Sequence, residues 1–195
     1  MKRRYLLTAL AAAATLAACK DSAAPAAGAA KGTTIPVSIA AIEAEAKGFT
    51  VGSTMSVRTV YVFFDPQCPH CAALWRAAKP LKSQAKFIWI PVGILGKGSI
   101  GQGAAMLAAK DPVAAMDEHE ASMAANKGGI SAMGDLDAQK AVVEKNTALM
   151  TKFGFASIPS IVAVQAQTGA VVSREGSMAT PELAAFLGLQ VPAGK

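Results

Sequence analysis

Apolar residues beyond residue 55 alternate between short strand-like runs and longer stripes at helical spacing. Residues 57–64 (VRTVYVFF) are rich in β-branched and aromatic side chains, which is typical of a buried strand. Residues 68–85 carry an apolar stripe at helical spacing, and Pro80 is expected to kink this helix. Residues 87–95 form a second apolar run of strand length. The pattern therefore predicts a strand, a helix and a second strand.

A long helical stretch is predicted from a glycine-bearing turn at residues 96–103 to about residue 152. It is interrupted at Asp111-Pro112, where Asp111 can cap a new helix that has proline at its first position. Further interruptions are expected at the glycines of the segment, Gly128, Gly129 and Gly134.

Two short strands and a final helix complete the pattern. Residues 160–165 and 170–174 predict strands joined by a turn. Thr180 is expected to be the N-cap of the last helix, with Pro181 at its first position and an end near Leu187. The order β-α-β, helices, β-β-α predicts an α/β fold.

The N-terminus has the features of an export signal of the lipoprotein type, assigned to residues 1–18. Basic residues at positions 2–4 precede an uncharged run over residues 5–18, which is too short to span a bilayer. The run ends in Leu-Ala-Ala-Cys19, which resembles a bacterial lipobox, whose cysteine becomes the acylated first residue of the mature chain. An ordinary signal cleavage with an incidental Cys19 is the alternative. We expect a periplasmic protein anchored to a bacterial membrane through Cys19.

A tether and a short helix are predicted between the signal and the folded domain, over residues 19–55. Residues 20–34 are small, polar and contain proline and glycine, as in flexible linkers. Residues 35–47 have the spacing of a short amphipathic helix, and residues 35–50 are expected to be either packed on the domain or loosely ordered. The catalytic domain is assigned to residues 56–190, with a helical insert at about 99–152.

The composition excludes two classes of protein. Hydrophobic residues make up 52% of the chain and charged residues 16%, which excludes a disordered, highly charged protein. The formal net charge is +6, but three basic residues lie at positions 2–4, and without them the balance is +3. Such a small charge without a basic cluster argues against a nucleic-acid partner.

The chain has three cysteines, and two of them form a close pair. If Cys19 carries lipid, Cys68 and Cys71 remain, and an exported compartment permits a disulfide between them. Such a short loop stabilises a fold very little, because the stabilisation grows with loop length. The pair is therefore expected to have a chemical role rather than a stabilising one.

The segment Cys68-Pro69-His70-Cys71 directly follows a predicted strand and opens a helix, the context of a thioredoxin-like redox motif. Unpaired N–H groups and the helix dipole stabilise a thiolate at Cys68, and Cys71 lies one turn further in. Pro69 fixes the first turn, and His70 can donate to the Cys68 thiolate or balance its charge. A zinc site lacks enough ligands, and haem attachment is excluded because Ala72 follows Cys71. No metal or other cofactor is expected.

Three segments resemble the DsbG/DsbC branch of the bacterial periplasmic thiol:disulfide interchange proteins, and DsbG most of all. They are VRTVYVFFDPQCPHCAALW (57–75), AAMLAAKDPVAAMDEHEAS (104–122) and NTALMTKFGFASIPSIVAV (146–164). The likeness covers about residues 57–187. It implies a thioredoxin-like fold with an inserted helical subdomain.

The resemblance also assigns roles to residues. The family's nucleophilic cysteine corresponds to Cys68, its resolving cysteine to Cys71, and its cis-proline to Pro159. Cys68 and Cys71 would form the redox disulfide, and Ile158 and Pro159 would face it together with Pro69 and His70. The implied partners are exported proteins with disulfides or oxidised cysteines, and a DsbD-like membrane thiol reductant or an oxidase.

This sequence departs from the family in three ways. Pro69-His70 is the pairing typical of the oxidase DsbA, and Ile158 stands where the isomerases usually have threonine. Only about 38 residues separate Cys19 from Val57, too few for the family's N-terminal dimerisation domain, so a monomer is expected. A disulfide isomerase or reductase, a DsbA-like dithiol oxidase and a non-catalytic binding lipoprotein all remain open.

Other conspicuous residues are interpreted as structural. Asp65-Pro66 is expected to form a turn, although Asp65 is the acid nearest to the cysteines. His119 is expected to be a solvated helix residue and Trp75 a core residue. Val62 lies where DsbA and thioredoxin carry a buried acid on the active-site strand, so no acid is available there. The methionines are expected to fill the core and the groove rather than bind metal; they include Met106, Met116, Met123 and Met133.

Overall fold

The structure is a computed structural model that describes residues 34–191 of the chain. The expected signal peptide, the expected lipidation site Cys19 and most of the expected tether lie outside the described residues. Among residues 34–191, no helix is both long and apolar enough to cross a membrane.

The described residues are built around one mixed sheet of five strands in the order β1-β3-β2-β4-β5. β2 and β3 are parallel, and the other neighbouring pairs are antiparallel. β2 lies in the middle and is buried over nearly its whole length, which explains its unbroken run of apolar residues. The strands are β1 (Phe49–Gly52), β2 (Thr59–Phe64), β3 (Lys86–Pro91), β4 (Ser160–Val164) and β5 (Val171–Glu175).

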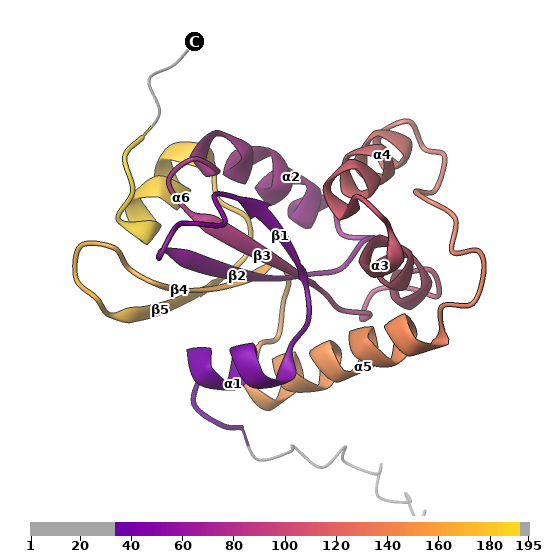
Figure 1. The fold of residues 1–195 in the computed structure, drawn as a ribbon, viewed down its shortest axis with the longest axis horizontal. Helices are drawn as coiled ribbons and strands as arrows, with labels where there is room; N and C mark the ends of the chain where they lie inside the picture. The colour runs from indigo at the N-terminus through magenta and orange to yellow at the C-terminus, as the bar shows by residue number, and fades with distance from the viewer. Residues whose placement is uncertain (1–33, 192–195) are drawn as a thin grey trace, which may run out of the picture. The chain divides into compact units, whose positions relative to one another are not determined.

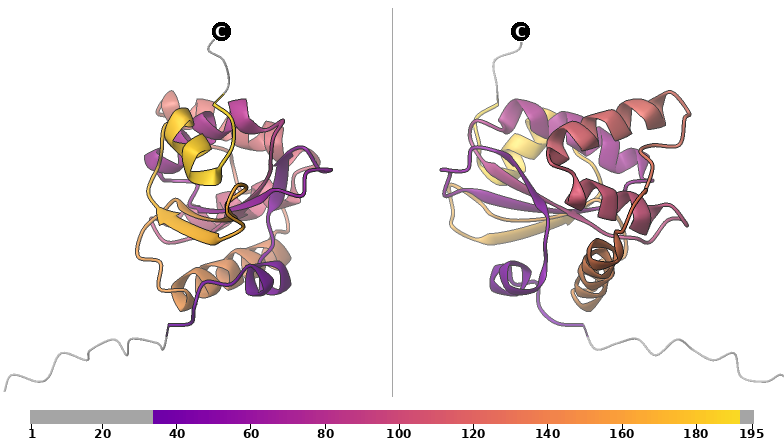
Figure 2. Two further views of the ribbon diagram at one scale, coloured as in Figure 1. Left: turned by 90° about the vertical axis from the view of Figure 1, so that its left-hand side faces the viewer. Right: turned by 45° about the vertical axis from the view of Figure 1, so that its right-hand side comes forward.

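Helices cover both faces of the sheet, so the predicted α/β class is confirmed (Figures 1 and 2). On one face lie α2 (Pro69–Ala78), which a single 3-10 turn (Lys79–Leu81) extends, and α6 (Thr180–Leu187). On the other face lie α1 (Ile39–Glu45) and α5 (Asp137–Lys152). The 3-10 turn at the end of α2 contains Pro80, where the sequence predicts a kink.

The helical stretch between β3 and β4 is divided where the sequence predicts. α3 (Ser99–Ala108) and α4 (Pro112–Ala124) precede α5, and α4 lies beside α2 (Figure 1). Asp111 caps α4, because its carboxylate accepts the N–H groups of the next turn. The three glycines that separate α4 from α5 all have positive φ. This insert therefore places helices beside α2, the helix that begins after Cys68.

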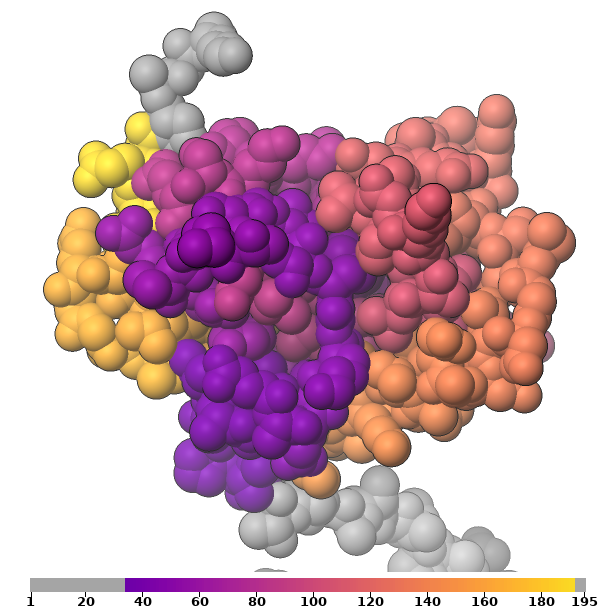
Figure 3. All heavy atoms as spheres, viewed as in Figure 1, coloured from indigo at the N-terminus to yellow at the C-terminus, as the bar shows by residue number. Residues whose placement is uncertain are grey.

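The segment before residue 56 contains more structure than the sequence predicts. The short helix expected within residues 35–47 is present as α1, and Ile42 is buried in the core. Residues 49–52, placed by the sequence in the tether segment, form β1 and pair with β3. In the space-filling view, α1 and β1 lie on the face toward the viewer, next to the helical insert (Figure 3). A four-residue strand is too short for its alternation to be recognised in the sequence.

The prediction that Thr180 is the N-cap of the last helix is wrong. Ala179 occupies the cap position, and Thr180 is the first residue of α6. The Thr180 hydroxyl donates instead to the carbonyl oxygen of Ala77, at 2.9 Å. The threonine therefore connects α6 to the end of α2, a long-range contact that local capping rules do not include.

The core is rich in aromatic side chains that meet edge to face. The ring of Trp89 lies 4.9 Å from that of Trp75 and 5.5 Å from that of Phe64, measured between centroids. Trp75 is buried, as the sequence predicts. Met106 and Met116 are also fully buried, whereas Met133 is 80% exposed and is not a core residue.

Asn146 connects three parts of the fold. It is fully buried on α5, and its amide nitrogen donates to the carbonyl oxygens of Lys47 and Pro91, at 2.8 and 3.0 Å. Its amide oxygen accepts the N–H of Lys47 at 3.0 Å. One side chain thus joins α5 to the end of β3 and to the segment before β1.

We predict that Asn146→Ala lowers the free energy of unfolding by about 1–3 kcal/mol, because it leaves backbone groups of Lys47 and Pro91 without partners. Urea denaturation followed by circular dichroism measures this change. The exposed Glu144 on the same helix provides the control, since Glu144→Ala should change stability by no more than about 0.5 kcal/mol. Equal effects of the two substitutions would contradict the prediction.

Candidate active site

Cys68 is the N-cap of α2, directly after the turn that follows β2. Its sulfur accepts the backbone N–H of Cys71 at 3.4 Å. The hydrogen bond from the Cys71 thiol lowers the pKa of Cys68 most, and burial opposes this effect. Backbone N–H groups of Cys71 and His70 and the charge of His70 lower the pKa further, to about 6. Cys68 is therefore largely a thiolate at neutral pH.

Cys71 lies in the first turn of α2 and is completely buried. Burial raises the pKa of its thiol far above the ordinary value, and the hydrogen bond to Cys68 raises it further. Both cysteines are free thiols in this structure. The pair thus consists of one sulfur that ionises easily and a shielded one that holds its proton.

The segment before β4 faces Cys68. The Ile158–Pro159 peptide bond is cis, as the sequence and its resemblance predict. In its protonated form, the Cys68 thiol donates a hydrogen bond to the carbonyl oxygen of Ile158, at 3.8 Å. Ile158 and Pro159 are buried, whereas Pro69 and His70 are exposed. Of the residues predicted for the site, Cys71 and Ile158 therefore contact the sulfur of Cys68, Pro159 follows Ile158 through the cis bond, and Pro69 and His70 lie at the exposed start of α2.

Asp65 directly follows β2 and is fully buried. One carboxylate oxygen accepts the N–H of Gln67 at 2.8 Å and the hydroxyl of Ser99 at 2.7 Å. The other accepts the N–H groups of Ile94 and Leu95, at 2.7 and 3.0 Å. The expected turn is present at residues 66–67. Asp65 also holds the turn to the loop after β3 and to the start of α3.

His119, on α4, is fully buried, so the prediction of a solvated residue is wrong. Its Nε2 lies 2.8 Å from the carbonyl oxygen of Pro66, and its Nδ1 accepts the N–H of Ile130 at 3.2 Å. Nε2 must therefore carry the proton and donate it to Pro66. Burial lowers the pKa of His119, which keeps the ring neutral. Gly129 packs against the ring, where a Cβ atom would approach within 2.4 Å.

A groove of about 380 Å³ opens beside Cys68, between α2 and α4. Pro69 and Met123 contribute apolar surface, and Arg76 and Glu120 contribute charge. Glu120 is only 9% exposed. Burial raises the pKa of Glu120 to about 7; the charge of Arg76 opposes this rise, and the charge of Cys68 adds to it.

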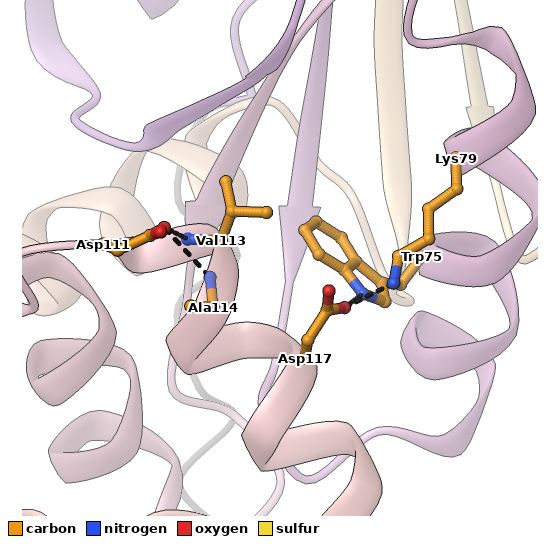
Figure 4. A network of polar contacts seen from close by, with 6 residues as sticks. All are labelled: Trp75, Lys79, Asp111, Val113, Ala114 and Asp117. Carbon is orange, nitrogen blue, oxygen red and sulfur yellow. Dashed lines mark hydrogen bonds and ion pairs between the residues drawn. The ribbon is translucent and has the colours of Figure 1, made fainter.

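Asp117 joins α4 to α2 one turn before Glu120. Its carboxylate accepts the indole N–H of Trp75 at 2.7 Å and forms an ion pair with Lys79 (Figure 4). The ammonium group of Lys79 also lies over the indole ring, 5.4 Å from its centroid. Figure 4 shows these three side chains meeting between the two helices, so their contacts connect α4 to α2 beside the groove.

The chain matches the family described as thioredoxin-like domain over residues 50–190. The protein belongs to the thioredoxin-like family. It is 34% identical over 143 residues to the thiol:disulfide interchange protein DsbG of Pseudomonas aeruginosa, covering 70% of this chain and 54% of that protein. It is 35% identical over 104 residues to DsbG of Escherichia coli, covering 52% and 42%. The match spans about half the length of these relatives.

Solved thioredoxin-like structures share the fold at lower sequence identity. The catalytic domain of Proteus mirabilis ScsC aligns with a TM-score of 0.58 and 18% identity, covering 76% of this chain and 96% of that domain. Pseudomonas aeruginosa DsbA2 aligns with a TM-score of 0.59 and 19% identity, covering 73% and 93%. The expected thioredoxin-like fold is therefore confirmed.

Sequence reasoning missed the parts of this thioredoxin-like site that α4 supplies. Met116, His119, Glu120 and Met123 have the spacing of one helix face, and the two methionines are apolar. This spacing could have placed His119 and Glu120 on the packed side of the helix. Among residues 34–191, no group of three or more histidine, cysteine or acidic side chains is arranged to hold a metal ion.

We predict that iodoacetamide labels Cys68 of the reduced protein and spares Cys71. The labelling rate should rise as the pH increases through about 6 and reach its plateau well below the ordinary pKa of a cysteine thiol, because the thiolate is the reactive species. Fragment mass spectrometry identifies the modified cysteine, and Cys68→Ser is the control that should remain unlabelled at both positions. Preferential labelling of Cys71 would show that Cys68 is not the reactive thiolate of the pair.

Proposed function

We propose that this protein is a periplasmic thiol:disulfide oxidoreductase that acts on exported proteins through Cys68 and Cys71. The observation that carries the proposal is the contrast within the pair: an ionised sulfur at a helix N-terminus and a buried thiol one turn away. The similarity to DsbG supports a thiol:disulfide interchange activity. The substrates are exported proteins with disulfides or oxidised cysteines.

The mechanism follows from the different properties of the two sulfurs. The Cys68 thiolate attacks one sulfur of a substrate disulfide, so a mixed disulfide forms and the second substrate sulfur leaves with the electron pair. Cys71 then loses its proton and attacks Cys68, which releases the first substrate sulfur and leaves a Cys68–Cys71 disulfide. The substrate gains two electrons from the two cysteines. One of its two protons is the one that Cys71 loses, and the other comes from water, because Cys68 reacts as a thiolate. Ile158 and Pro159 face the exchanging sulfurs and bind the substrate chain beside them.

Isomerase or reductase work is the favoured direction, because the relatives are DsbG proteins. A DsbA-like oxidase is the second candidate, since a stabilised thiolate favours the reduced pair and makes the disulfide oxidising. Pro69-His70 and Ile158, which depart from the isomerase pattern, also favour the oxidase. In the favoured direction a DsbD-like membrane reductant regenerates the dithiol, and in the second an oxidase regenerates the disulfide.

A redox titration against glutathione tests the proposal and its direction. We expect a reduction potential near about −180 mV or lower for an isomerase or reductase, and near about −120 mV for a DsbA-like oxidase. Cys71→Ser should accumulate mixed disulfides with exported proteins, because the resolving thiol is gone, and Cys68→Ser should accumulate none. A pair that fails to cycle and a Cys71→Ser variant that traps no protein would favour the non-catalytic binding alternative.

We also propose that Cys19 carries a lipid that anchors the protein to a bacterial membrane. The support is the lipobox-like segment that ends at Cys19 and the several acyl chains that a lipoprotein cysteine carries. Cys19→Ala should move the protein from the membrane fraction to the soluble periplasm and leave its redox potential unchanged. A soluble wild-type protein whose mature N-terminus is not Cys19 would contradict the proposal.

A further inference from the structure

The proposed exchange requires a proton as well as two sulfurs. A substrate sulfur that leaves a disulfide departs as a thiolate, and an ordinary cysteine thiolate takes up a proton at neutral pH because its pKa is about 8.5. Thiols of low pKa leave readily without a proton, whereas alkyl thiols leave more slowly. An acid beside Cys68 would therefore accelerate exchange with protein disulfides.

Most of the titratable groups near the cysteines already have hydrogen-bond or ion-pair partners within the protein. Both oxygens of Asp65 accept two hydrogen bonds each from the surrounding chain. Both ring nitrogens of His119 are used by backbone groups. Asp117 is held by a tryptophan and a lysine. His70 is exposed and does not line the groove.

Glu120 is different, because it lines both the groove that contains Cys68 and a neighbouring hollow beside Lys79, and only burial and charges influence the pKa of its carboxyl group. No hydrogen bond from the described residues lowers or raises the proton affinity of Glu120. Its carboxyl group is therefore free to exchange a proton with a molecule in the groove. With a pKa raised to about 7, it is protonated in about half of the molecules at neutral pH, which suits both giving and taking a proton.

The charges that face Glu120 come from two helices. Arg76 on α2 and Lys79 in the 3-10 turn that extends it favour the carboxylate, whereas Asp117 on α4 and the Cys68 thiolate favour the protonated acid. α3 and β1 also pack against α4 but contain no titratable side chain. The Cys68 thiolate therefore helps to keep the proton on Glu120 before the attack, and this effect disappears once the mixed disulfide has formed.

We propose that Glu120 is the acid-base residue of this site and protonates the substrate sulfur that leaves when Cys68 attacks. The inference rests on the proposed thiol exchange. The bond from Cys68 to one substrate sulfur forms, the substrate S–S bond breaks, and the electron pair stays on the second sulfur. The proton of Glu120 moves to that second sulfur, and the carboxylate regains a proton from water. In the reverse direction the carboxylate takes the proton of an attacking substrate thiol.

The test compares two disulfides that differ in their need for a proton. Dithiobis(nitrobenzoate) releases an acidic aromatic thiol, and bis(hydroxyethyl) disulfide releases an alkyl thiol of ordinary pKa. Both react in stopped flow with the full chain carrying Cys19→Ala and Cys71→Ser, so that Cys68 alone reacts and no second step follows. We expect Glu120→Gln to slow the reaction with the alkyl disulfide by at least about tenfold and to change the aromatic reaction by less than about twofold.

Glu118→Gln is the matched control, because Glu118 is an exposed residue of the same helix. It should leave both rates unchanged. A Glu120→Gln variant in which the two rates fall together would overturn the inference, because a change in fold or in Cys68 ionisation acts on both disulfides. The parent protein of these variants carries Cys19→Ala and Cys71→Ser and retains Glu120. Its failure to react with either disulfide would instead contradict the proposed function.

The pH profile of the parent protein gives a second test that needs no substitution at Glu120. The ratio of the alkyl rate to the aromatic rate cancels the ionisation of Cys68, which both reactions share. We expect this ratio to fall as the pH rises through about 7, because Glu120 loses its proton in that range. A ratio that stays constant from about pH 5 to pH 9 would overturn the inference.

Discussion

The chemistry proposed for this protein depends on one sulfur, that of Cys68, held at the start of α2. Cys68 is stabilised as a thiolate only while it accepts hydrogen bonds from the thiol and the backbone N–H of Cys71. The effect of a helix N-terminus is confined to its first turn. A small change in the path of the chain before Cys68 would therefore remove the stabilisation. The positions of the three preceding residues, 65–67, therefore determine whether Cys68 lies where these hydrogen bonds can form.

Each of these three residues is held by the helical insert. The carboxylate of Asp65 accepts the hydroxyl of Ser99, and the carbonyl oxygen of Pro66 accepts the ring N–H of His119. The side chain of Gln67 donates to Gln102, which in turn donates to the backbone before α5. The insert is thus the scaffold of the active-site turn. It also supplies one wall of the groove, so the same helices position Cys68 and shape the space where we propose that substrate binds.

The sequence predicts the parts of this arrangement that depend on local chemistry. The continuous apolar run of β2, the proline and aspartate that begin α4, and the cysteine pair at a strand–helix junction all follow from short-range rules, and all are present. The parts it does not predict depend on partners that are distant in sequence. Asp65 has the sequence context of a turn residue, but in the fold its carboxylate also accepts hydrogen bonds from Ser99 and from the loop after β3. Thr180 has the sequence context of an N-cap, but its hydroxyl donates a hydrogen bond to the distant carbonyl oxygen of Ala77.

The position of Glu120 has a physical advantage over an acid within the sheet. Val62, on β2, is 1% exposed and packed in the core, so a carboxyl group there would be cut off from the water that must restore its proton. A carboxylate without a partner is also costly to bury at such a depth. Glu120 lies at the edge of a groove, where burial is sufficient to raise its pKa to about 7 and the opening still admits water. An acid on α4 can therefore be reset after every exchange, and it can reach a substrate sulfur without disturbing the core that fixes Cys68.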